Sequence, residues 1–100
     1  MASYNKLVRD KIPEILDKKG VSYEKRIADD AEFKAELIKK LTEECAEFAE
    51  AGDLNELADV LEVISALKTL PEYTDVLDVQ DKKRLERGGF AQKIILKGEK

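Results

Sequence analysis

The feature that most constrains this chain is a pair of helical patterns separated by only two residues. Apolar residues recur at helical spacing over residues 30–51, and Gly52 ends this pattern. Asp53 is a favourable N-cap, and the second pattern extends from it to about Leu70, just before Pro71. Such a short connection requires the two helices to run antiparallel, as a hairpin. The apolar arc of the first helix comprises Phe33, Leu37, Leu41, Cys45, Phe48 and Ala51.

Shorter elements flank the hairpin. Residues 13–19 predict a short first helix, because proline suits a first helical turn and a glycine follows the stretch. Residues 72–87 predict a last helix, which a further glycine ends. The partly β-branched stretches 21–27 and 90–96 predict a small two-stranded ribbon. We therefore expect the whole chain, residues 1–100, to form one all-α domain of about four helices, with this ribbon as an addition.

The composition excludes several kinds of functional site. The chain has no histidine, which removes histidine general bases, Ser-His and Cys-His nucleophile pairs and histidine-containing zinc sites. Its single cysteine, Cys45, can form neither an intrachain disulfide nor a cysteine-rich metal cage, and we expect it to be a small buried residue of the core. Any chemistry must therefore rely on carboxylates, amines, hydroxyl groups or a metal ion.

The charge balance and hydropathy also limit the partners and the compartment. The net charge of −4 gives no reason to expect a nucleic-acid partner, since such proteins usually present a basic face. No apolar stretch is long enough to span or target a membrane. A lone cysteine fits a reducing compartment. We therefore expect a cytoplasmic protein with neither a nucleic-acid nor a membrane partner.

The charges are distributed very unevenly along the chain. Residues 41–67 contain eight acidic residues and no lysine or arginine, so this segment carries −8 and the rest of the chain carries +4. Like charges at this density repel one another across successive helical turns. A compensating positive group is therefore expected near the hairpin. The eight acids are Glu43, Glu44, Glu47, Glu50, Asp53, Glu56, Asp59 and Glu62.

Four of these acids lie near the apolar sides of their helices. In projection Glu44 falls within the apolar arc and Glu47 lies at its edge. Glu56 and Asp59 are flanked by apolar residues on both sides, and the hairpin can bring both pairs together near its closed end. Partly dry carboxylates need protons or a cation, and oxygen-only ligation favours Mg²⁺ or Mn²⁺. The alternative is a solvated acidic face, which we expect for Glu43, Glu50 and Glu62.

The acidic motifs and their flanks resemble one protein family. The stretches EECAE at residues 43–47 and ELAD at residues 56–59 resemble the EExxE…ExxD signature of the all-α, MazG-like nucleoside triphosphate pyrophosphohydrolases, which are relatives of the phosphoribosyl-ATP pyrophosphohydrolases. The opening YNKLVRDKIP at residues 4–13, the stretch ELADVLEVI at residues 56–64 and the late ERGGF at residues 86–90 are similar to a small single-domain branch of that family. The resemblance covers most of the chain.

The resemblance implies an activity and a metal site. The fold would be a MazG-like helical bundle, and the reaction would be Mg²⁺-dependent cleavage of a nucleotide between its α- and β-phosphates, giving a monophosphate and pyrophosphate. Such enzymes clear noncanonical or surplus nucleotides. Carried over by position, the metal ligands and catalytic acids would be Glu44, Glu47, Glu56 and Asp59.

Phosphate oxygens also need donors from the protein. Lys40 lies one turn before Glu44 and is the best candidate, the alternative being a surface ion pair between these two residues. The opening segment and the end of the last helix supply other cations, of which arginine can bind phosphate through two N–H groups. Asn5 and Tyr4 could read or stack on a base. The further basic candidates are Lys6, Arg9, Lys11, Arg84 and Arg87.

Two further expectations concern partners. The second hairpin helix has apolar residues on nearly every side, which is more apolar surface than one hairpin can cover, so we expect self-association. The family resemblance likewise implies a homodimer or a dimer of dimers, with sites close to a subunit interface. The alternative to an enzyme is a helical binding module, whose acidic hairpin docks a basic protein or senses nucleotides without turnover.

Overall fold

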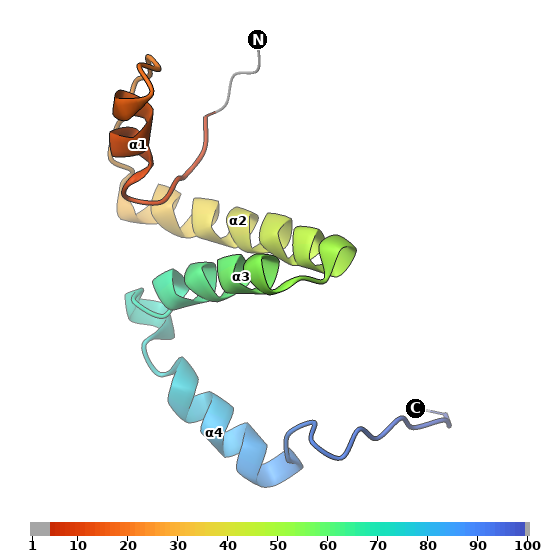
Figure 1. Cartoon of the computed structure of the whole chain (residues 1–100). Coiled ribbons are helices and arrows are strands. Elements are labelled where there is room, and N and C mark those ends of the chain that lie inside the picture. The colour runs from red at the N-terminus through yellow and green to blue at the C-terminus, as the bar shows by residue number, and fades with distance from the viewer. Residues whose placement is uncertain (1–4, 100) are drawn as a thin grey trace.

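The computed structural model describes residues 5–99, which contain four α-helices and one short 3₁₀ helix (Figure 1). Helices α2 and α3 pack side by side as an antiparallel hairpin, the most extensive helix contact in the described range. The predicted all-α fold with four helices and a central hairpin is therefore confirmed. The elements are α1 (Ile12–Lys18), α2 (Asp30–Ala51), α3 (Leu54–Leu67), the 3₁₀ helix η1 (Pro71–Tyr73) and α4 (Val76–Arg87). None of the helices in the described part of the chain has both the length and the apolarity to cross a bilayer.

Capping interactions fix the ends of the hairpin helices. At the start of α2, the Asp29 carboxylate accepts a hydrogen bond from the backbone N–H of Glu32 at 2.8 Å. At the start of α3, the Asp53 carboxylate accepts one from the backbone N–H of Glu56 at 2.9 Å. Between the helices, Gly52 has a φ of 65°, a left-handed conformation that glycine adopts without the steric penalty of a Cβ atom. The turn thus forms at the two residues that the sequence indicates.

The apolar core lies toward the open end of the hairpin. Leu37 of α2, Val63 of α3 and Leu70 are buried and pack together. Lys34 near the start of α2 forms an ion pair with Glu72 of η1, with Nζ 3.6 Å from Oε2, and so ties η1 to α2. The acidic residues lie near the closed end of the hairpin, away from this core. Partly buried side chains around the core are Leu7, Phe33, Leu41, Ala66, Leu67 and Tyr73.

Helix α2 has the predicted bounds, whereas four other helix boundaries differ. Helix α1 starts and ends one residue earlier than expected. Helix α3 ends at Leu67, because Leu70 precedes Pro71 and is extended, with ψ of 141°, as a residue before proline prefers. The expected start of the last helix forms the separate helix η1 instead, so that α4 begins only at Val76. Local backbone preferences around Pro71 therefore set the end of α3 and the start of α4.

The predicted two-stranded ribbon is wrong, because residues 5–99 contain no strand. The stretch 21–27 runs beside α1, whereas the stretch 90–96 follows α4 on the opposite side of the hairpin (Figure 1). A strand needs a neighbour for its backbone N–H and C=O groups, and the path of α4 keeps these two segments apart. Both segments are therefore irregular.

Candidate functional site

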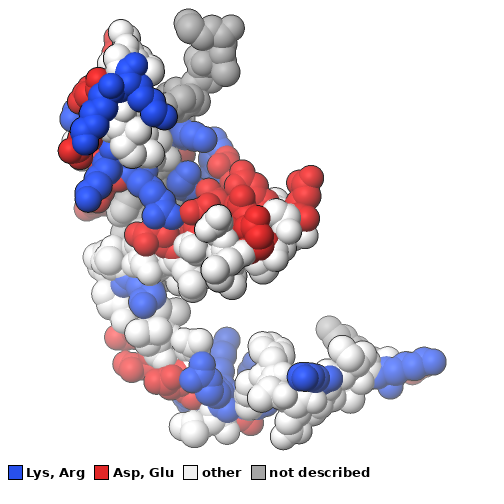
Figure 2. All heavy atoms as spheres, in the orientation of Figure 1, with Lys and Arg blue, Asp and Glu red and all other residues white. Residues whose placement is uncertain are grey.

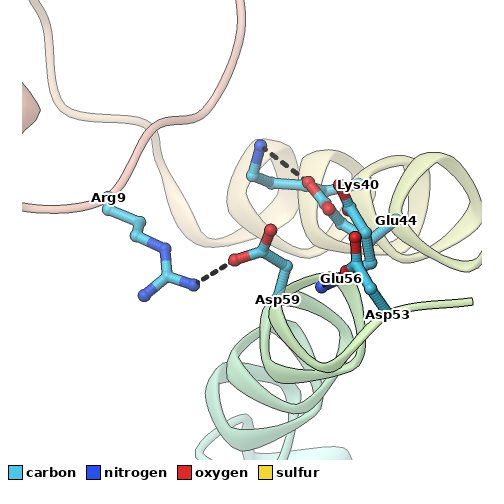
Figure 3. A network of polar contacts seen from close by, with 6 residues as sticks. All are labelled: Arg9, Lys40, Glu44, Asp53, Glu56 and Asp59. Atoms are coloured by element: carbon cyan, nitrogen blue, oxygen red, sulfur yellow. Dashed lines mark hydrogen bonds and ion pairs between the residues drawn. The ribbon is translucent and has the colours of Figure 1, made fainter. Parts of the chain in front are cut away.

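Three carboxylates meet between the hairpin helices near the closed end (Figure 3). Glu44 projects from α2, and Glu56 and Asp59 project from the first half of α3. One carboxylate oxygen of each residue lies within 4.8 Å of one oxygen of each of the others. The one-turn spacing of Glu56 and Asp59 places both on the side of α3 that faces α2. We call these three residues the acidic triad.

Two oxygens of the acidic triad lack a hydrogen-bond donor within the described part of the chain. They are Oε2 of Glu44 and Oε2 of Glu56, and both are buried. Burial raises the pKa of Glu44 above its ordinary value, and the charge of Glu47 raises it further. The pKa of Glu56 is also raised, first by burial and then by the charge of Glu47. An acceptor without a donor from the protein must take one from water, carry a proton or bind a cation, so these two oxygens are candidate ligand atoms.

The fourth predicted ligand, Glu47, does not join the acidic triad. Its side chain is exposed, and among residues 5–99 the group of acids that meets within 4.8 Å consists of the triad alone. Its charge nevertheless acts on the pKa values of Glu44 and Glu56. A role for Glu47 as a ligand therefore stays a prediction. The acids expected on solvated surface are all exposed: Glu43, Glu50 and Glu62.

Two basic side chains reach the acidic triad. Nη2 of Arg9 donates a hydrogen bond to Oδ1 of Asp59 at 2.8 Å, joining the segment before α1 to α3 (Figure 3). Nζ of Lys40 lies 3.8 Å from Oε1 of Glu44, one turn along α2. This is the ion pair that the sequence allowed as an alternative to phosphate binding. Arg9 and Lys40 supply positive charge of the kind expected near the hairpin.

Leu7 holds the opening segment in position. This side chain packs against the core cluster and so places its neighbours Lys6 and Arg9 beside the hairpin. Leu7 and Val8 between Lys6 and Arg9 were a sequence signal for such an anchor. Sequence reasoning missed this anchor, and it also missed Lys39. The segment and α2 together form a shallow depression lined by Lys6, Leu7, Glu36, Lys39, Lys40 and Glu43.

Of the remaining phosphate-binding candidates, the two arginines of α4 lie away from the acidic triad (Figure 1). Arg84 and Arg87 lie in the last turns of α4, which leads away from the hairpin (Figure 1). Asn5 and Lys11 are exposed. Tyr4 lies outside the described residues. Contacts of these residues with a substrate stay predictions.

Cys45 is not a core residue, contrary to the sequence prediction. It is exposed, whereas Leu37 is buried and Glu44 partly buried on the packed side of α2. Cys45 follows Glu44 by one residue and is therefore turned about 100° away from it. The helix rotation that brings Glu44 inward necessarily turns Cys45 outward.

The donor set of the acidic triad fits a hard divalent cation. It offers carboxylate oxygens from two rigid helices, and two of these oxygens are buried without a donor in the described range. Mg²⁺ prefers such oxygen ligands, and the neighbouring Arg9 and Lys40 carry N–H donors of the kind that bind phosphate oxygens. Comparisons with models of protein families, with curated proteins and with solved structures gave no significant match.

Proposed function

We propose that this protein is a Mg²⁺-dependent pyrophosphohydrolase that cleaves nucleoside triphosphates between the α- and β-phosphates. The observation that carries the proposal is the pair of buried oxygens without donors, on Glu44 and Glu56, beside the carboxylate of Asp59. Carboxylate oxygens held in these positions suit a cation that binds the phosphates of the substrate. The MazG-like sequence motifs supply the reaction class, with a nucleoside monophosphate and pyrophosphate as products.

The acidic triad would hold the ion, with Glu47 as the predicted fourth ligand. A bound Mg²⁺ neutralises charge on phosphoryl oxygens and lowers the pKa of bound water. The carboxylates keep their positions because both helices are capped and packed, so little rearrangement is needed when substrate arrives. An acid of this group that is not used as a ligand can orient the attacking water and accept its proton.

Arg9 and Lys40 are proposed to bind the phosphates. The pair between Arg9 and Asp59 uses Nη2, and the planar guanidinium presents further N–H donors in a geometry that matches phosphate oxygens. Lys40 lies at a looser distance of 3.8 Å from Glu44, so a phosphate can draw its ammonium group away from the carboxylate. Both cations therefore stand beside the triad, where a metal-bound polyphosphate would lie.

Metal binding is tested by thermal unfolding with Mg²⁺, with Mn²⁺ and with EDTA. Ligands that bind the folded chain alone stabilise it by RT ln(1 + [L]/Kd), about 2.7 kcal/mol at one hundred times the Kd. We expect a higher Tm with either ion and no such rise in Glu44→Gln. The matched control is Glu43→Gln, which removes the neighbouring exposed charge and should keep the rise. An equal response of both variants would refute a specific site.

Catalysis is tested by pyrophosphate release from a panel of nucleoside and deoxynucleoside triphosphates. Glu44→Gln and Asp59→Asn should each reduce the rate roughly 100-fold or more, because charge stabilisation by the metal contributes several kcal/mol. Glu43→Gln should retain the rate. Metal-dependent stabilisation without turnover of any nucleotide would support the sensing or docking module instead. Unchanged turnover in Asp59→Asn would remove our assignment of the site.

A further inference from the structure

One ion pair links the segment before α1 to the acidic triad. Nη2 of Arg9 donates a hydrogen bond to Oδ1 of Asp59 at 2.8 Å, although the two residues are fifty positions apart in the sequence. Asp59 also supplies one of the three carboxylates whose oxygens lie within 4.8 Å of one another. In Figure 3 its carboxylate lies between the guanidinium of Arg9 and the other two acids. The same group therefore faces both an internal cation and the proposed metal site.

Positive charge reaches the acidic triad from outside the acidic segment 41–67. Figure 2 shows acidic side chains gathered along the hairpin, with lysine and arginine side chains toward α1. When ionised, the three acids carry −3, and the side chains of Arg9 and Lys40 reduce this charge to −1. A divalent ion held together with both side chains would make the group +1. The ion and the two side chains therefore compensate the same negative charge, and they repel one another.

The contact of Arg9 can break without displacing the segment that carries it. The side chains of Arg9 and Asp59 are 54% and 43% exposed, and ion pairs exposed to this degree contribute little to stability. Arg9 lies in an irregular segment, and Leu7, two residues earlier, packs against the core cluster. The backbone is thus anchored at Leu7, whereas the long side chain of Arg9 can change rotamer. Asp59 is held in place by α3 in either case.

We infer that Arg9 competes with the divalent ion for Asp59, and that a phosphate group bound beside the ion ends this competition. The inference rests on the metal site proposed above. Beside the ion, the guanidinium of Arg9 is repelled by like charge and leaves the carboxylate. Phosphate oxygens then accept hydrogen bonds from its planar N–H groups. Arg9 therefore weakens binding of the ion alone and favours joint binding of ion and phosphate, so that each raises the affinity for the other by the same factor.

The alternative role for Arg9 is that of a fixed partner of Asp59. Groups that donate hydrogen bonds to a metal-binding carboxylate often orient it, and their removal weakens metal binding. Two observations favour exchange over orientation. Asp59 is already positioned by a helix whose start Asp53 caps, and its pair with Arg9 is open to competing water. An orienting and a competing arginine have opposite effects on the affinity for the ion, so removing the charge of Arg9 distinguishes them.

Titration calorimetry with Mn²⁺ alone tests the competition without reference to catalysis. Arg9→Gln should bind Mn²⁺ roughly 5-fold more tightly than the wild-type chain, at the lower end of the range for coupled sites. The matched control is Lys11→Gln, which removes the same charge at an exposed position two residues along the chain. It should change the Kd by less than about twofold, because salt screens an exposed charge that does not contact the carboxylates within the described range.

The coupling to phosphate is tested with methylenediphosphonate, a pyrophosphate analogue whose P–C–P link is not hydrolysed. Electron paramagnetic resonance measures free Mn²⁺, calibrated with the analogue in the absence of protein. The analogue should raise the affinity for Mn²⁺ severalfold more in the wild-type chain than in Arg9→Gln. Arg9→Lys keeps the charge and lacks the planar fork, so it should bind Mn²⁺ alone as the wild type does and show an intermediate gain with the analogue.

The outcomes separate this inference from the proposed metal site. Mn²⁺ binding that is unchanged or weaker in folded Arg9→Gln would overturn the competition and leave the metal site intact. An analogue that tightens Mn²⁺ binding equally in the wild type and in Arg9→Gln would overturn the coupling to phosphate. No Mn²⁺ binding in the wild type or in any variant would refute the metal site, and the inference with it. Circular dichroism shows whether each variant is folded, and Arg9→Met, which is also uncharged, replaces Arg9→Gln if that variant is not.

Discussion

At the scale of single residues, the fold holds two carboxyl groups in surroundings that disfavour their charge. The pKa values of Glu44 and Glu56 are raised, chiefly because burial destabilises the ionised form. A carboxyl group with a higher pKa in the folded chain destabilises the fold once the pH exceeds the unfolded value, about 4.3 for glutamate. The destabilisation grows until the pH has passed the folded pKa. The metal-free protein therefore loses stability at the residues that we propose to bind the ion.

The substitution Glu44→Gln should raise the Tm at neutral pH in the absence of divalent ions, because glutamine has a similar shape and no charge. The gain should be largest above the folded pKa of Glu44 and should shrink toward zero below about pH 4, where the carboxyl group is protonated in both states. Calorimetric scans across this pH range measure it. Glu43→Gln should show no comparable gain, since that side chain is exposed. A gain in Tm that persists below about pH 4 would show that the charge of Glu44 is not its cause.

At the scale of helices, the turn between α2 and α3 decides where the acidic triad forms. The triad draws on the last turns of α2 and the first turns of α3, which the turn brings together. The helix dipole favours the carboxylate of Glu56 in the first turn of α3, whereas Glu44 lies about two turns before the end of α2, beyond the range of that dipole. The turn geometry holds these two acids near one another.

The substitution Gly52→Ala should destabilise the protein by about 1 kcal/mol, because an alanine with positive φ is sterically strained. The φ of Gly52 is 65°, and no neighbouring atom lies within 4 Å of a Cβ there, so strain rather than a clash produces the loss. Urea unfolding measures the change. Gly89→Ala is the matched control, since that residue has no positive φ and also has open space. Equal losses in the two variants would refute the role of the turn.

At the scale of the whole molecule, the chain consists of a packed half and an open half. The buried apolar residues of the described range lie in or directly after the hairpin: Leu37, Val60, Val63 and Leu70. Every residue from 74 to 99 is exposed, and α4 leads away from α2 and α3 (Figure 1). Stability is therefore concentrated in the hairpin, and residues 88–99, which contain no helix, have little to hold them.

Limited digestion with trypsin should reveal this division. We expect the first cuts after Lys25, Arg87, Lys93 and Lys97, because proteases act first on exposed segments without regular structure and at frayed helix ends. Cleavage after Lys39 and Lys40, in the middle of α2, should follow much later. Mass spectrometry of a time course identifies the order. Early cleavage within α2 would contradict the packing described for the hairpin.

Some of the structure could be predicted from local sequence signals. The bounds of α2 follow from a cap at each end and a long apolar arc. The end of α3 was harder to predict, because the apolar pattern continues to Leu70 while the backbone already departs from the helix before Pro71. The prediction of a two-stranded ribbon from residues 21–27 and 90–96 was wrong, because β-branched residues favour strands only where a neighbouring strand is available.

Sequence alone determined the helical hairpin and which acidic residues are candidates for its site. Periodicity, caps and charge are properties of residues close together in the chain. Tertiary structure decided which of those acids meet. It brought Glu44, Glu56 and Asp59 together, left Glu47 exposed, and joined Arg9 to Asp59 across fifty positions of sequence. It also turned Cys45 of α2 and Leu54, Leu57 and Leu61 of α3 outward. The rotation of each helix about its axis depends on which side packs, and packing joins residues that local patterns cannot relate.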